Sequence, residues 1–119
     1  MKFIADIDNN RLYMTLEGFY TEDRLHDAYD MALEEANKLQ DGYTVINDVS
    51  RLRVTTEGAA KYLRKMSDYA KMRKVVLTIR IVGNELSKMQ MKDITVGNYK
   101  VVEVNSIEEA NAYLEEKGL

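Results

Sequence analysis

The chain has 119 residues, a net charge of −3 and neither cysteine nor proline. This length is typical of one domain that buries a core without a disulfide or metal, so we expect a single domain over residues 1–119. The lack of cysteine excludes disulfides, thiolate zinc sites, iron–sulfur clusters and cysteine nucleophiles. No stretch reaches the ~20 apolar residues of a spanning helix, so we expect a cytoplasmic protein without membrane insertion.

The N-terminal residues are predicted to form a β-hairpin followed by a helix. Apolar and polar residues alternate over residues 3–7 and 12–16, which is the period of half-buried strands. The DNN triplet between them favours a turn, and we expect Gly18 to end the second strand. Thr21 can cap the helix that follows, whose apolar residues recur at helical spacing as far as Leu39.

Strand and helix signals then alternate along the chain. Residues 43–49 and 75–82 are rich in β-branched residues, and the second run is apolar enough to be typical of a central, buried strand. The helix between them is predicted to begin at Thr55 or Thr56. Its apolar stripe consists of Ala59, Leu63, Met66 and Ala70.

The C-terminal third is predicted to add a short helix over residues 85–92, a strand over residues 99–104 and a last helix. Ser106 fits a capping box at the start of this helix, and Gly118 can end it. The order is therefore β-β-α-β-α-β-α-β-α. Because strands alternate with helices, the sequence predicts an α/β fold with a mixed, mostly parallel sheet packed against helices.

One local motif accompanies this order of elements. Asp48-Val49-Ser50 ends the third predicted strand, and Thr55-Thr56-Glu57-Gly58 opens the second predicted helix. Together with the order, these residues resemble STAS domains, the family of sulfate-transporter tails and anti-sigma-factor antagonists. In the antagonists a D-[LV]-S segment precedes a D-S-S-G helix start. The resemblance covers nearly the whole chain as topology and implies a non-enzymatic, STAS-like interaction or regulatory module.

The resemblance also implies a candidate phosphoacceptor. In the phospho-regulated antagonists the first serine of D-S-S-G receives a phosphate from a partner kinase, and Thr56 occupies that position. Gly58 keeps the glycine of the motif, whereas Thr55 stands in place of its acidic residue and Glu57 in place of its second serine. Some small stand-alone members of the STAS-like superfamily are thought to bind small apolar molecules. A carrier or sensor of a small apolar or anionic ligand is therefore the alternative function.

The same junction is a candidate site on physical grounds. Ligands bind at the carboxyl ends of parallel strands, and a helix N-terminus attracts anions. We expect an interaction or anion-binding surface there. Its predicted residues are Ser50, Arg51, Arg53, Thr55, Thr56 and Gly58. These residues can also form an ordinary strand end and helix cap.

A second candidate site is an apolar pocket between the second and third predicted helices. Methionine and tyrosine make adaptable apolar surfaces that line pockets and interfaces. The predicted lining residues are Tyr62, Met66, Tyr69, Leu86 and Met89. The same side chains can also be ordinary core.

Charge is distributed along the chain in blocks. Residues 1–50 carry a net charge of −7, residues 51–100 of +8 and residues 101–119 of −4. These opposite blocks favour a protein partner or self-association, and a small apolar ligand is the other expected partner. Because the whole chain is acidic, we do not expect nucleic acid as a partner.

Catalytic and metal-binding patterns are missing from the sequence. His26 is the only histidine, which is too little for a typical zinc site. There is no nucleophile elbow, phosphate-binding loop or dinucleotide fingerprint. We therefore expect no enzyme, metal or cofactor, and we interpret His26 as a helix-surface residue that pairs with Asp30.

Overall fold

The computed structural model describes residues 1–54, 57–83 and 100–119. The helices and strands in these ranges follow the predicted order. They are β1 (Lys2–Asp6), β2 (Arg11–Tyr20), α1 (Glu22–Ala36), β3 (Thr44–Val54), α2 (Glu57–Met72), β4 (Leu77–Ile81), β5 (Val101–Val104) and α4 (Ile107–Lys117). The helix predicted over residues 85–92 lies outside the described residues.

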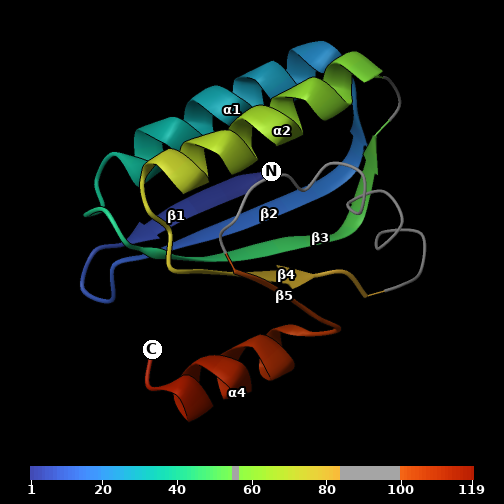
Figure 1. The fold of residues 1–119 in the computed structure, drawn as a ribbon. Helices are drawn as coiled ribbons and strands as arrows, with labels where there is room; N and C mark the ends of the chain where they lie inside the picture. Colours follow the sequence, from blue (N-terminus) through green and yellow to red (C-terminus); the bar gives the residue numbers. More distant parts are fainter. Residues whose placement is uncertain (55–56, 84–99) are drawn as a thin grey trace.

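The described strands form one sheet in the order β1-β2-β3-β4-β5. β1 and β2 make the predicted antiparallel hairpin, and the strands from β2 to β5 are parallel. The chain steps across the sheet in one direction through α1 and then through α2. Because parallel crossovers are right-handed, both helices cover the same face, whereas α4 lies on the other face (Figure 1). The predicted α/β fold with a mostly parallel sheet is confirmed.

Each face of the sheet has its own apolar core. Under α1 and α2, Val49 and Leu52 of the sheet pack in one cluster with Leu63 of α2. On the opposite face, Ile79 packs in a second cluster with Leu114 of α4. β4 is buried along its whole length, as predicted for a central strand, because it lies between β3 and β5.

Three predicted helix ends are confirmed. The Thr21 hydroxyl accepts a hydrogen bond from the backbone N–H of Arg24 at the start of α1. The Ser106 hydroxyl accepts one from Glu109 at the start of α4. Gly118 follows α4 with a φ of 71°, a left-handed conformation that glycine adopts without a steric penalty.

Two predicted strand ends are wrong. Gly18 does not end β2, which runs on to Tyr20, and β3 does not stop at Val49 but continues to Val54. Gly18 has a φ of 93° and pairs with Leu52 inside the sheet. The two extensions are stabilised by their pairing with each other, and local sequence signals do not report such long-range pairing.

The first helix also ends earlier than predicted. α1 stops at Ala36, and Leu39 follows in a turn although it is buried. Arg73, which lies just after α2, donates hydrogen bonds to the carbonyl oxygens of Ala36 at 3.2 Å and Leu39 at 2.6 Å. Since the last carbonyls of a helix need partners, a side chain from a distant segment stabilises this end.

Candidate functional site

The carboxyl-terminal halves of β2 and β3 form a two-stranded extension of the sheet. Residues 17–20 pair with residues 51–54, whereas β1 reaches only Thr15 and β4 reaches only Asp48. Within the described residues, this β2–β3 ribbon therefore pairs with no further strand. Figure 1 shows both strands curving away from the rest of the sheet toward the beginnings of α1 and α2.

An irregularity in strand pairing lies at the base of the β2–β3 ribbon. Thr15 pairs with Asp48, but Glu17 pairs with Arg51, so β3 uses one residue more than β2 over this interval. An extra residue of this kind bends a strand and redirects its side chains, and such bulges are frequent beside functional sites.

A polar surface hollow of ≈ 300 Å³ lies at this irregularity. It is lined by Thr15, Leu16, Glu17, Asp48, Ser50 and Arg51. The Asp48 carboxylate accepts hydrogen bonds from the backbone N–H of Ser50 at 3.1 Å and from its hydroxyl at 2.7 Å. The Arg51 guanidinium lies 3.9 Å from the Glu17 carboxylate, and both side chains are more than half exposed, so this ion pair contributes little to stability.

The structure brings three of the predicted junction residues together. Ser50 and Arg51 line the hollow, and Arg53 lies two residues further along β3, where it donates a hydrogen bond to the Leu52 carbonyl oxygen at 2.8 Å. Gly58 lies in the first turn of α2. Thr55 and Thr56 lie outside the described residues, so the anion-binding and phosphoacceptor hypotheses remain predictions there.

Phe19 is an exposed residue that was not among the predicted site residues. It pairs with Arg53 across the β2–β3 ribbon, and 70% of its surface is exposed. The neighbouring Tyr20 is fully buried, and burial raises the pKa of its hydroxyl. The alternation of β2 could have indicated this arrangement, because Leu12, Met14 and Leu16 put even-numbered residues inward.

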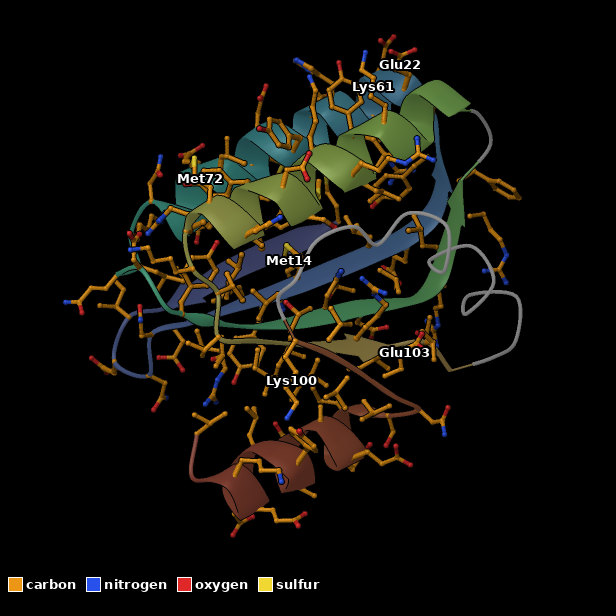
Figure 2. The ribbon with its side chains drawn as sticks, in the orientation of Figure 1. Met14, Glu22, Lys61, Met72, Lys100 and Glu103 are labelled. Atoms are coloured by element: carbon orange, nitrogen blue, oxygen red, sulfur yellow. The ribbon has the colours of Figure 1, made fainter. Side chains whose placement is uncertain are left out.

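Two lysines of α2 lie close to other side chains, one of which belongs to α1. The Lys61 ammonium lies 3.8 Å from the Glu22 carboxylate where the two helices begin (Figure 2). The Lys65 ammonium lies 5.0 Å from the ring centroid of Tyr62, within the range of a cation–π contact. On α1, His26 lies 3.7 Å from Asp30, which confirms the predicted pair.

The predicted apolar pocket is described only in part. Met66 and Tyr69 line a cavity of ≈ 50 Å³ between the sheet and the paired helices α1 and α2. Tyr62 does not line this cavity; its ring lies 5.3 Å from the ring of His26 at the contact between α1 and α2. Leu86 and Met89 lie outside the described residues, so a pocket that includes them stays a prediction.

Part of the sheet side of this cavity is polar, a feature that was not among the predictions from the sequence. Asn47, Thr78 and Arg80 all line it and are almost completely buried. Thr78 and Arg80 stand two apart within an apolar run. A strand places such residues on the same face, so their spacing was a usable signal.

The fold and these two sites define a structural class of domain, but they do not define a specific activity. The chain is an α/β domain with a mixed sheet, a polar hollow at a strand bulge and a cavity under two helices. No protein-family model matches the chain, and no curated protein matches it. None of the described helices is long and apolar enough to cross a membrane. Residues 1–54, 57–83 and 100–119 contain no cluster of three or more His, Asp or Glu that could hold a metal ion.

Proposed function

We propose that this chain is a non-enzymatic, STAS-like interaction module that docks a protein partner through the β2–β3 ribbon. The observation that supports the proposal is the exposure of Phe19 beside two arginines. Phe19 is 70% exposed, Arg53 is its partner in the ribbon, and the Arg51 side chain is 82% exposed. We call these three residues the ribbon surface.

The composition of the ribbon surface favours a protein partner with apolar and acidic groups. Aromatic and arginine residues are enriched in interfaces and dominate their binding energy. Arginine also forms bidentate hydrogen bonds with carboxylates. A partner that covers Phe19 with apolar side chains and presents carboxylates to Arg51 and Arg53 would match this chemistry.

Regulation through Thr56 is a further part of the proposal, and it depends on the resemblance to the antagonists. A phosphate there would add up to two negative charges close in sequence to Arg51 and Arg53. The modification would then weaken the attraction of these arginines for an acidic partner. Self-association through oppositely charged blocks is the other form that docking could take.

Site-specific photo-crosslinking tests the docking proposal in cells of the source. p-Benzoylphenylalanine replaces Phe19 in one variant and Ile107 in the matched control. Ile107 is 42% exposed and begins α4, which follows the edge strand β5, and β4 separates this strand from the β2–β3 ribbon in the sheet. We expect position 19, but not position 107, to crosslink one discrete protein or a second copy of the chain.

The partner identified in this way allows a quantitative test. Loss of one interface hot spot costs about 2 kcal/mol or more, which is about thirtyfold in affinity. We therefore expect Arg53→Glu to weaken binding of the captured partner by at least that factor. Crosslinking of the same proteins from positions 19 and 107, or unchanged affinity of Arg53→Glu, would contradict the docking proposal.

A carrier or sensor of a small ligand is the second candidate function, and the cavity under α1 and α2 supports it. Ligand sites are mostly apolar and contain a few well-placed polar groups. The cavity combines apolar residues such as Met66 with the buried polar residues Asn47, Thr78 and Arg80. Native mass spectrometry of protein purified from its source would reveal a co-purifying molecule.

A further inference from the structure

A polar patch is buried on the sheet side of the cavity under α1 and α2. Asn47 of β3 and Arg80 of β4 are paired in register, and Thr78 precedes Arg80 by two residues on the same strand. Paired residues of parallel strands and alternate residues of one strand share a face. Asn47 is only 8% exposed, Arg80 5% and Thr78 4%.

Two atoms of this patch lack the partners that buried polar atoms normally have. Asn47 Oδ1 and Thr78 Oγ1 are buried and have no hydrogen-bond partner in the described part of the chain. Buried polar groups nearly always have a partner, because leaving one unsatisfied costs more than a single bond contributes. Both residues line the cavity, so their side chains are available to hydrogen-bond with a molecule inside it.

Arg80 adds a positive charge to the same wall. Its guanidinium stays protonated at physiological pH and forms strong hydrogen bonds with carboxylates. The Thr78 hydroxyl can donate a hydrogen bond, and the Asn47 carboxamide can turn so that its Nδ2 donates. Each of the three side chains can therefore donate a hydrogen bond to an anionic group in the cavity.

The rest of the cavity sets the size and polarity of the occupant. Most of the remaining lining is apolar, and it includes Leu12, Met14, Ala32, Ala36, Leu63 and Met66. Figure 2 shows Met14 between the sheet and the paired helices. The cavity volume of ≈ 50 Å³ is about a third of the ~150 Å³ that accommodates benzene. A cavity of this size excludes a long acyl chain and limits the occupant to a small anion.

We infer that this cavity binds a short-chain monocarboxylate. The carboxylate accepts hydrogen bonds from Arg80, Thr78 and Asn47, and the carbon body lies against apolar residues such as Leu63 and Met66. This inference rests on the second candidate function, a small-ligand carrier or sensor. It is independent of docking through the ribbon surface.

Titration of the full chain with propionate and its uncharged isostere propionamide tests the inference by ¹⁵N NMR. We expect propionate to shift the amide signals of Asn47, Thr78 and Arg80 saturably. Its affinity should exceed that of propionamide by about tenfold or more, because charge-assisted hydrogen bonds are about twice as strong as neutral ones. Thr78→Val should weaken propionate binding about tenfold. The matched control is Thr44→Val, which removes a buried hydroxyl outside the cavity and should leave binding unchanged.

Arg80→Met should remove the preference for propionate over propionamide. If this variant does not fold, the comparison of the two ligands on the wild-type chain still tests whether the cavity prefers a carboxylate. Equal affinities for propionate and propionamide would overturn the carboxylate inference and leave a carrier function standing. Absence of saturable shifts with both compounds would overturn the site. If native mass spectrometry also finds no co-purifying molecule, the second candidate function fails as well.

Discussion

Gly83 lies directly against Ser50 at the polar hollow. A Cβ built on Gly83 would lie 2.9 Å from the Ser50 Cβ, and Gly83 has a φ of 70°. Both the backbone conformation and the space therefore require glycine at this position. The end of β4 is thus packed against the strand bulge that carries Ser50, so the geometry of the hollow depends on a residue outside its lining.

Gly83→Ala should destabilise the fold more than Gly42→Ala. Both glycines have positive φ angles, but a Cβ at Gly42 would meet no atom closer than 3.8 Å. Each variant should lose about 1–2 kcal/mol from the left-handed conformation, and Gly83→Ala should lose about 1–3 kcal/mol more from the clash. Urea denaturation measures both, and equal losses would show that Ser50 moves away without cost.

Arg73→Met should lower the free energy of unfolding by about 1.5–3 kcal/mol, the range for hydrogen bonds to charged groups. The Arg73 side chain is 14% exposed and donates to the carbonyl oxygens of Ala36 and Leu39. Its hydrogen bond to Asp41 raises the pKa of its guanidinium. Lys71→Met, at an exposed position of the last turn of α2, should change stability by less than about 0.5 kcal/mol. Chemical denaturation of both variants checks this, and equal effects would contradict the role of Arg73.

Stability should fall in acid partly through Glu35. A hydrogen bond from Lys38, followed by one from the Ala5 backbone N–H, lowers the pKa of the Glu35 carboxyl below 4.5. A carboxyl with a lower pKa in the folded state stabilises the fold above its unfolded pKa. This contribution disappears as the pH falls through the folded pKa. Glu35→Gln should therefore flatten the pH dependence of unfolding below about pH 4.5 relative to wild type.

The exposed neighbour of Glu35 provides the control for this pH dependence. Glu34→Gln removes a carboxylate from an exposed position of the same helix and should leave most of the acid-dependent loss in place. Denaturation curves recorded at neutral and acidic pH for the three proteins give the comparison. An unchanged slope in Glu35→Gln would show that other carboxyls account for the acid sensitivity.

Thr78→Val should raise stability by about 1 kcal/mol, because it removes a buried hydroxyl that has no partner in the described residues. Thr44→Val is the matched comparison on the adjacent strand. Thr44 is also buried, but its hydroxyl accepts a hydrogen bond from Arg11 at 3.1 Å, so its replacement should destabilise. Thermal denaturation of the ligand-free proteins compares the stabilities of the two variants. A Thr78→Val variant less stable than wild type would mean that the Thr78 hydroxyl already has a partner such as ordered water.

Phe19→Ser should leave stability within about 0.5 kcal/mol of wild type, because Phe19 is 70% exposed. Tyr20→Ala, at the adjacent and fully buried position, should cost about 3–5 kcal/mol, as large aromatic truncations in cores do. Equilibrium denaturation measures both variants. A large loss in Phe19→Ser would show that this side chain serves folding, which would remove the main support for the ribbon surface.

Local sequence signals predicted the elements whose causes are local. Thr21, Ser106 and Gly118 act on backbone groups within their own turn, so a residue type and its position were sufficient. Alternation over a few residues likewise predicted the hairpin of β1 and β2. The ends of β2 and β3 were predicted too early because Gly18 pairs with Leu52 from a distant part of the chain.

The candidate sites show the same division between local and long-range causes. The sequence placed Ser50, Arg51 and Arg53 at the end of a parallel strand, where the structure has the hollow and the ribbon. Arg80 stood out only as an interruption of an apolar run. Its register with Asn47 on β3 depends on how two strands align, which neither segment specifies alone.

The sequence by itself determined the class of this protein. Hydrophobic periods, caps and glycines are read within a few residues and are sufficient for an α/β fold with a mostly parallel sheet. Only the tertiary structure decided that Gly83 packs on Ser50, that Phe19 pairs with Arg53, and that polar side chains of β3 and β4 meet in one cavity. The physical reason is that strand register, bulges and cavities arise from pairing and packing between segments far apart in the chain.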